Sequence, residues 1–126
     1  METEWEHAAK AGIKYIHAGS NNIEEVAWYY KNSGARTHPI AQKKPNAWGL
    51  YDMSGNVYEG VWDAWKSDAY SRGDCIYLIT DRSSPKRVYR DGSWGNDVRG
   101  TRVSFRSGDD ASHRGNDQGF RFLRTF

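Results

Sequence analysis

The chain has 126 residues and a net charge of +2 at pH 7. This length fits one domain (1–126), and so weak a charge selects neither nucleic acid nor an anionic membrane surface as a partner. The single cysteine, Cys75, excludes an intrachain disulfide, and no apolar run reaches the length of a membrane span. Charged residues follow Met1 directly, so we expect no secretory signal here. A piece of a longer chain would look the same, so the compartment and the oligomeric state stay open.

The first predicted element is a helix over residues 2–12. Its apolar positions recur at helical spacing, and three glutamates crowd the N-terminal end, where the helix dipole favours negative charge. The apolar face consists of Trp5, Ala8, Ala9 and Ile13. Residues 24–30 are apolar but too short to assign. Residues 31–47 form a long polar connection, of the kind that a ligand or an ion often holds in place.

Short strands are predicted for the second half of the chain, where apolar and polar side chains alternate over brief stretches. The predicted strands cover residues 56–65, 77–79, 86–90, 102–106 and 119–123. Residues 66–74 and 107–117 are polar and rich in turn formers, and are predicted to be loops. With 13 glycines and few long helical patterns, the sequence indicates a loop-rich fold with short strands.

The stretch from Asn46 to Glu59 combines turn residues, aromatic side chains and two carboxylates. Asp52 and Glu59 bracket the turn with charged oxygens, and the carbonyls of Gly55 and Val57 lie between them. Calcium prefers such a mixture of carboxylate and backbone oxygens. The residues alone leave two interpretations open: a calcium site, or a tight turn that Asp52 caps while Glu59 is exposed.

No other metal or nucleophile pattern emerges from the sequence. The histidines lack the spacing of a transition-metal site and have no cysteine cluster beside them; they are His7, His17, His38 and His113. Nothing selects a Ser-His-Asp triad. No sequence motif of a reactive cysteine surrounds Cys75, so we expect a partly buried or surface thiol.

Four segments, in order, resemble the formylglycine-generating-enzyme family, also called the sulfatase-modifying-factor domain. Glu2–Lys10 is similar to its TEAEWEYAAR helix, and residues 37–59 resemble its HPVGxKxPNxxGLYDMxGNVWEW core. Val88–Trp94 looks like its VxRGGSW strand, while Arg102–Arg106 and Gly119–Arg121 look like its RxxxR and terminal GFR. Family members are longer and begin upstream of the first of these segments, so the chain resembles their C-terminal half.

The resemblance implies an α+β fold of the irregular C-type-lectin type, with short antiparallel strands, one N-terminal helix and long loops. It also implies structural Ca²⁺, held by the side chains of Asp52 and Glu59 and by the carbonyls of Gly55 and Val57. In this family a cysteine pair after the GGSW motif binds copper and performs the oxidation. Residues 95–101 contain no cysteine, so we expect a non-catalytic relative. Gly60 also replaces the second Trp of the WEW motif.

Residues 94–118 also resemble the variable region of diversity-generating-retroelement target proteins, which use the same fold. On this reading Trp94, Val103 and Phe120 are scaffold, and adaptable polar and aromatic side chains between them form an antibody-like binding surface. The predicted binding residues are Gly95, Asn96, Asp97, Arg99, Gly100, Phe105, Ser107, Asp109, Asp110, His113, Gly115, Asn116 and Asp117, with Trp62 and Trp65 at the margin.

Three alternatives to this interpretation stay open: a solvated polar loop without a binding role, an oxidase-like or protein-modifying enzyme fragment, and a regulatory or scaffolding domain of a larger protein. For the binding surface we expect a protein ligand first and a glycan second, because aromatic rings and carboxylates also suit sugars.

Overall fold

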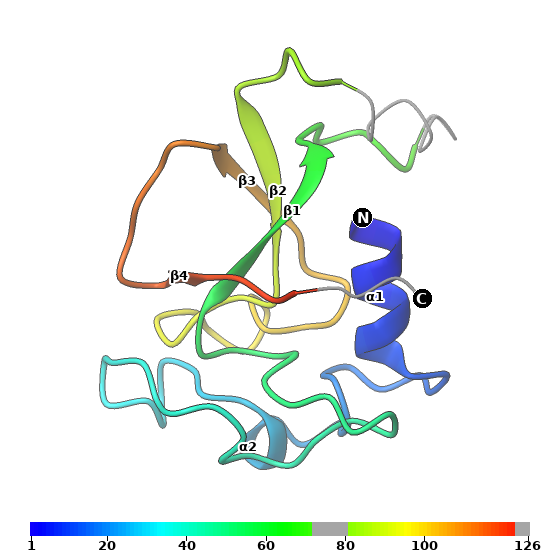
Figure 1. Cartoon of the computed structure of the whole chain (residues 1–126). Coiled ribbons are helices and arrows are strands. Elements are labelled where there is room, and N and C mark those ends of the chain that lie inside the picture. Colours follow the sequence, from blue (N-terminus) through cyan, green and yellow to red (C-terminus); the bar gives the residue numbers. More distant parts are fainter. Residues whose placement is uncertain (72–80, 123–126) are drawn as a thin grey trace.

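The computed structural model describes residues 1–71 and 81–122 and has an α+β architecture. The helices are α1 (Glu2–Lys10) and α2 (Ile23–Val26), and the strands are β1 (Tyr58–Ala64), β2 (Lys86–Arg90), β3 (Ser107–Asp110) and β4 (Gln118–Gly119). The strands form one sheet in the order β3-β2-β1-β4. The β1–β2 and β2–β3 pairs are antiparallel, while β4 runs parallel to β1 (Figure 1). Long loops carry most of the rest, as the family resemblance predicts.

Helix α1 joins the core through Trp5 and Ala9, which are buried with Met53 and Val103. The helix ends at Ala11, whose left-handed backbone returns its N–H to the carbonyl of His7. The predicted apolar face is therefore confirmed for its first turns, whereas Ile13 lies beyond the helix end and is exposed.

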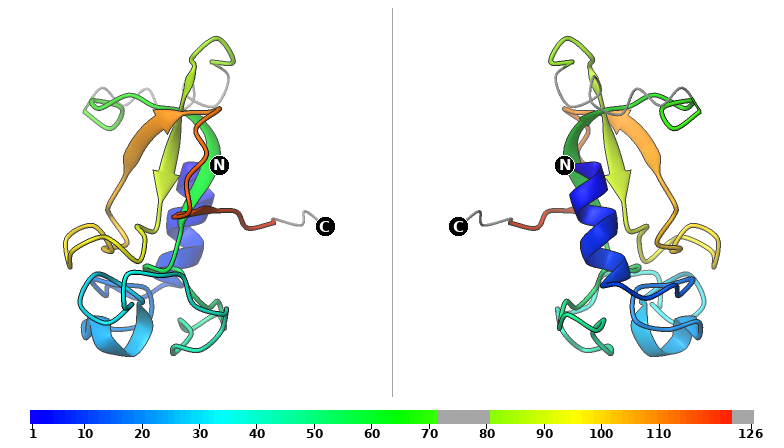
Figure 2. Two further views of the ribbon diagram at one scale, coloured as in Figure 1. Left: turned by 90° about the vertical axis from the view of Figure 1, so that its left-hand side faces the viewer. Right: turned by 90° about the vertical axis from the view of Figure 1, so that its right-hand side faces the viewer.

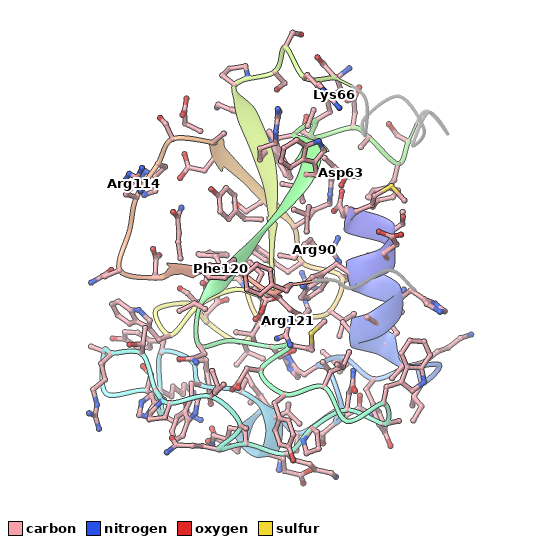
Figure 3. The ribbon with its side chains drawn as sticks, viewed as in Figure 1. Asp63, Lys66, Arg90, Arg114, Phe120 and Arg121 are labelled. Carbon is pink, nitrogen blue, oxygen red and sulfur yellow. The ribbon has the colours of Figure 1, made fainter. Side chains whose placement is uncertain are left out.

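Charged residues connect α1 to the sheet, in addition to the apolar contact of its core cluster with Val61 on β1. Arg90 on β2 is fully buried, and its guanidinium donates to Glu2 Oε1 at 2.6 Å. Arg106 donates to the same carboxylate at 2.8 and 2.9 Å. We call Glu2, Arg90 and Arg106 the charge network; it joins residues 88 and 104 positions apart in the sequence. Figure 3 labels Arg90 where it lies between β2 and α1.

The predicted strand over residues 102–106 is wrong, and a strand lies instead in the predicted loop. Phe105 donates its N–H to the Arg102 carbonyl, so this stretch is a turn that directs Val103 into the core. Strand β3 follows and pairs along its whole length with β2. Its polar side chains gave no apolar alternation, yet backbone pairing needs none. The predictions for residues 77–79 and Cys75 lie outside the described residues.

The end of the described chain corrects a second prediction. Only Gln118 and Gly119 pair with β1, and Phe120, expected to be scaffold, is 76% exposed. The next side chain, Arg121, packs into the molecule instead, where its guanidinium donates to the buried Glu59 carboxylate. Figure 2 shows the described part of the segment after β4 leaving the edge of the sheet, and Arg121 within it donates to the Tyr51 carbonyl and to Glu59. Among the described residues no helix is long and apolar enough to span a membrane.

Candidate functional site

A pocket of about 180 Å³ lies between the sheet and the loop that joins β3 to β4. We call it the acidic pocket. It is lined by Tyr58, Tyr89, Ser107, Asp109, His113, Asp117 and Gln118. Figure 1 shows the loop as a wide arc on the opposite side of the strands from α1. Four of the predicted binding residues, Ser107, Asp109, His113 and Asp117, therefore meet in one place.

Two tyrosines form the sheet side of the acidic pocket. Their ring centroids lie 6.5 Å apart in an edge-to-face arrangement. The N–H of Tyr58 donates to the Asp117 carbonyl at 2.7 Å, which fixes the loop against β1. A side chain at Gly60 would meet Tyr89, since its Cβ would lie 3.3 Å from Cε1 of that ring. The departure of Gly60 from the WEW motif thus leaves the space that Tyr89 occupies.

The acidic pocket has a negative electrostatic character. Oδ2 of Asp109 lies 3.7 Å from Nδ1 of His113, and both side chains are about half exposed. Burial raises the pKa of Tyr89, and the charges of Asp109 and Asp110 raise it further. Burial also raises the pKa of Tyr58, with a further contribution from the Asp117 charge. Both tyrosines are therefore neutral hydroxyls at pH 7.

No lysine or arginine is among the described residues that line the acidic pocket. Arg87 stands opposite Asp109 in the β2–β3 ladder, but its guanidinium donates to the carbonyls of Ser84 and Lys86. The carboxylates of Asp109 and Asp117 therefore line the cavity with His113 as the only basic side chain among its described lining residues.

Several predicted binding residues hold turns instead. Oδ1 of Asn96 accepts from the Ser93 N–H at 2.7 Å, and Oδ1 of Asp97 accepts from two backbone N–H groups of its own turn. Asp110 accepts from the backbone and the hydroxyl of Ser112. Gly100 is buried, and a Cβ there would lie 2.7 Å from the Asn96 side chain. Asn96 and Gly100 therefore have structural roles, which could not be recognised from the polar composition of the segment.

The remaining predicted residues do not line the acidic pocket. Phe105 is half-buried, with its ring centroid 6.5 Å from that of Tyr58. The exposed ones are Gly95, Arg99, Gly115 and Asn116. Sequence reasoning missed Tyr58, Tyr89 and Gln118. The alternation of β2 could have indicated Tyr89, because it places that ring on the face opposite the buried Val88 and Arg90.

The predicted calcium turn is stabilised by contacts within the protein. Asp52 is buried and its Oδ2 accepts from the Ala41 N–H at 2.8 Å. The Glu59 carboxylate is also buried, and accepts from Trp5 Nε1 at 2.7 Å and from Arg121 at 2.8 Å. Within the described residues no three or more His, Cys, Asp or Glu side chains form a group that could hold a metal. The alternative of an exposed Glu59 is wrong.

Negative charge at this turn is nevertheless only partly compensated. Asp91 is completely buried, and neither of its carboxylate oxygens has a hydrogen-bond partner. Burial raises the pKa of Asp91 well above its usual value, Glu59 and Asp52 raise it further, and Arg121 opposes them. One guanidinium thus faces three carboxylates.

Comparison with known proteins identifies the family. Residues 1–126 match the model of the sulfatase-modifying factor enzyme 1-like domain. The chain belongs to this family. This sulfatase-modifying-factor domain is 34% identical over 142 residues to the chaperone protein LppX of Paenibacillus barcinonensis. The alignment covers 97% of this chain and 47% of LppX. It is 32% identical over 102 residues to the serine/threonine-protein kinase pkn1 of Chlamydia pneumoniae. This alignment covers 74% of this chain and 15% of the kinase.

Solved structures confirm the fold. Treponema denticola variable protein 1 superposes with a TM-score of 0.80 at 34% identity, over 95% of this chain and 44% of that protein. PvdO from Pseudomonas aeruginosa gives a TM-score of 0.77 at 29% identity, over 95% of this chain and 49% of PvdO. The chain spans about half the length of these relatives and of LppX. The similarity to a variable protein supports, at a coarse level, the comparison with that class.

Proposed function

We propose that this domain is a non-catalytic binding module whose acidic pocket receives a positively charged side chain, lysine or arginine, of a protein partner. The observation that carries the proposal is the pocket itself: two tyrosine rings and the carboxylates of Asp109 and Asp117 lie around one cavity, with His113 but no lysine or arginine in the described lining.

The chemistry of the walls selects a cation. Aromatic rings attract cations through their faces, and carboxylates form strong charge-assisted hydrogen bonds with guanidinium and ammonium groups. Neutral tyrosine hydroxyls add donors and acceptors at the margin. A glycan is the second candidate, because the same rings can stack on a sugar, yet it would leave two carboxylates without a positive partner.

The predicted binding residues fall into an exposed group and a group held by the fold, which supports a scaffold that presents variable side chains to a ligand. Gly115 and Asn116 are exposed on the loop that borders the acidic pocket, and Arg99 is exposed on the turn that Asp97 holds, whereas Asn96 and Gly100 are fixed by the fold. The structural match to Treponema denticola variable protein 1 supports a scaffold of this kind. As a diversity-generating-retroelement target, the protein would vary among siblings at the exposed and pocket-lining positions and stay constant at Asn96 and Gly100.

We also propose that the domain does not oxidise cysteine, since residues 95–101 offer no cysteine pair. Supplied with copper and a sulfatase-type cysteine peptide, the purified domain should yield no aldehyde by mass spectrometry. Formylglycine that disappears in Cys75→Ser would contradict this part of the proposal.

Calcium at the Asp52–Glu59 turn belongs to the same proposal. The two side chains and the carbonyls of Gly55 and Val57 would hold the ion, which would neutralise the excess of buried carboxylate around Asp91. The charge balance at Asp91 supports it, and it requires that Glu59 share its oxygens with Arg121 or exchange that contact for the ion.

The binding site is tested by NMR titration of the ¹⁵N-labelled domain with N-acetyl-arginine amide, against its neutral isostere N-acetyl-citrulline amide. We expect saturable shifts at Tyr58, Tyr89 and Asp109 with the arginine compound only. The variant Asp109→Asn/Asp117→Asn should lose them, while the exposed control Glu25→Gln keeps them. Equal shifts with the citrulline compound, or shifts outside the acidic pocket, would refute a cation site.

A further inference from the structure

The imidazole of His113 lies close to both carboxylates of the acidic pocket. Its Nδ1 is 3.7 Å from Oδ2 of Asp109. Its other nitrogen, Nε2, and Oδ1 of Asp117 both approach Gly115, because a Cβ at this glycine would lie 3.3 Å from the first atom and 2.5 Å from the second. One imidazole is therefore beside the two groups that would bind a cationic ligand.

A hydrogen-bonded turn holds this imidazole at the acidic pocket. The N–H of His113 donates to the Asp110 carbonyl at 3.0 Å, and Oδ1 of Asp110 accepts from the backbone and the hydroxyl of Ser112. The N–H of Ala111 donates to the carbonyl of Pro85, the residue before β2, at 2.8 Å. The turn is thus fixed to the sheet, although the His113 side chain is about half exposed.

His113 is the group whose charge changes near neutral pH among the described residues that line the acidic pocket. Histidine is the side chain that ordinarily gains its proton between about pH 5 and 8, whereas carboxylates do so near pH 4. Burial raises the pKa of Tyr58 and of Tyr89, so both hydroxyls stay neutral over this range.

The other charged groups near His113 keep their charge over the same range. Hydrogen bonds from Ser112 hold the pKa of Asp110 below its usual value, and the charges of His113 and Lys86 lower it further. Lys86 stands opposite Asp110 in the β2–β3 ladder. Arg114 follows His113 on the loop, where Figure 3 labels it. A change in the charge of the acidic pocket between pH 8 and 5.5 therefore comes from His113.

A proton on His113 and a cation in the acidic pocket compete for the same carboxylates. The neutral imidazole leaves Asp109 and Asp117 to a ligand. The imidazolium forms charge-assisted contacts with them and repels a second positive charge nearby. Two ligands that oppose each other in this way weaken each other's binding by the same factor.

We propose that protonation of His113 releases a cationic ligand from the acidic pocket, so that binding is strong at about pH 8 and weak at about pH 5.5. This regulation rests on the proposed function, since it needs a cation at that site. An arginine side chain is charged at both pH values, so the change lies in the protein.

The test measures the dissociation constant of N-acetyl-arginine amide at pH 8.0 and 5.5 by NMR titration. We expect it to rise about tenfold at the lower pH, since a histidine of ordinary pKa is about nine-tenths protonated there. In His113→Gln the ratio of the two constants should be close to one, whatever the affinity at pH 8. His113→Lys, with a permanent charge, should bind weakly at both. The control His7→Gln, exposed on α1, should keep the tenfold ratio.

A second measurement uses the parent protein without ligand. The ¹³C carboxyl resonances of Asp109 and Asp117 should shift with the same midpoint as the His113 ring. A tenfold ratio that persists in His113→Gln, or carboxyl resonances that do not follow the ring, would overturn the pH regulation and leave the cation site standing. Binding that is absent at pH 8 would refute the proposed function, and the regulation with it.

Discussion

The charge network and the acidic pocket both contain charged side chains, but these side chains have different roles in the two regions. In the charge network, Glu2 and Arg90 are almost completely removed from solvent, and the Glu2 carboxylate accepts from both Arg90 and Arg106. In the acidic pocket, Asp109 and His113 are half exposed and 3.7 Å apart. Removing one partner of a buried ion pair leaves an uncompensated charge, whereas changing a solvated one alters little. Charge at the first site therefore maintains the fold, and charge at the second is available for a ligand.

The largest effect is expected in the charge network. Glu2→Gln removes the charge that faces both Arg90 and Arg106, and breaking a buried pair from one side costs about 3–5 kcal/mol. Urea unfolding should show this loss, while the exposed control Glu4→Gln stays close to the parent. A loss below about 1 kcal/mol would mean that water reaches the network and would remove the contrast between the two regions.

Acid should weaken the same network. Burial tends to raise the pKa of Glu2, but the hydrogen bonds and charges of Arg106 and Arg90 outweigh it and hold the pKa below its usual 4.5. The unfolded chain then binds the proton more readily than the folded one, so stability is full above pH 4.5 and declines as the pH falls through the folded-state pKa. Melts from pH 6 to 3 should show a decline that is shallower in Glu2→Gln.

Removal of calcium is expected to have the next largest effect on stability. An ion at a hundredfold excess over its dissociation constant stabilises the native state by about 2.7 kcal/mol. EDTA should therefore lower the melting temperature, and elemental analysis should find calcium. With no ion found and an unchanged melt, the carboxylates are balanced within the protein, and Asp91→Asn should then stabilise it at neutral pH by removing an unpaired buried carboxylate.

A smaller difference should appear within the predicted binding set itself. Asn96→Ala leaves the Ser93 N–H without its acceptor and should cost about 1–2 kcal/mol, as for loss of a capping side chain. Arg99→Ala, three positions away and exposed, should change stability by no more than about 0.5 kcal/mol. Equal thermal melts for the two variants would mean that Asn96 is a surface residue after all.

The smallest stability change is expected at the acidic pocket, together with a complete loss of binding. Asp109→Asn/Asp117→Asn should melt within about 0.5 kcal/mol of the parent and no longer bind N-acetyl-arginine amide. A collapse of the fold in this variant would place the two carboxylates among the structural charges and end the contrast with Glu2.

Elements with a local pattern of residues could be predicted from the sequence. The helix at Glu2–Lys10 followed from apolar spacing, and β2 from alternation over residues 86–90. The order of four motifs determined the family, because each motif is contiguous in the chain. The polar segment that contributes to the acidic pocket was also recognisable from composition, down to Ser107, Asp109, His113 and Asp117.

Only the tertiary structure decided the role of each polar side chain. Asn96 and Asn116 look alike in the sequence, yet one holds a turn and the other is exposed. Phe120 was expected to be scaffold and is exposed, whereas the next side chain, Arg121, packs against the buried Glu59. Pairing of Glu2 with Arg106 joins residues 104 positions apart. Burial and pairing depend on such distant neighbours, and periodicity along the chain reports only near ones.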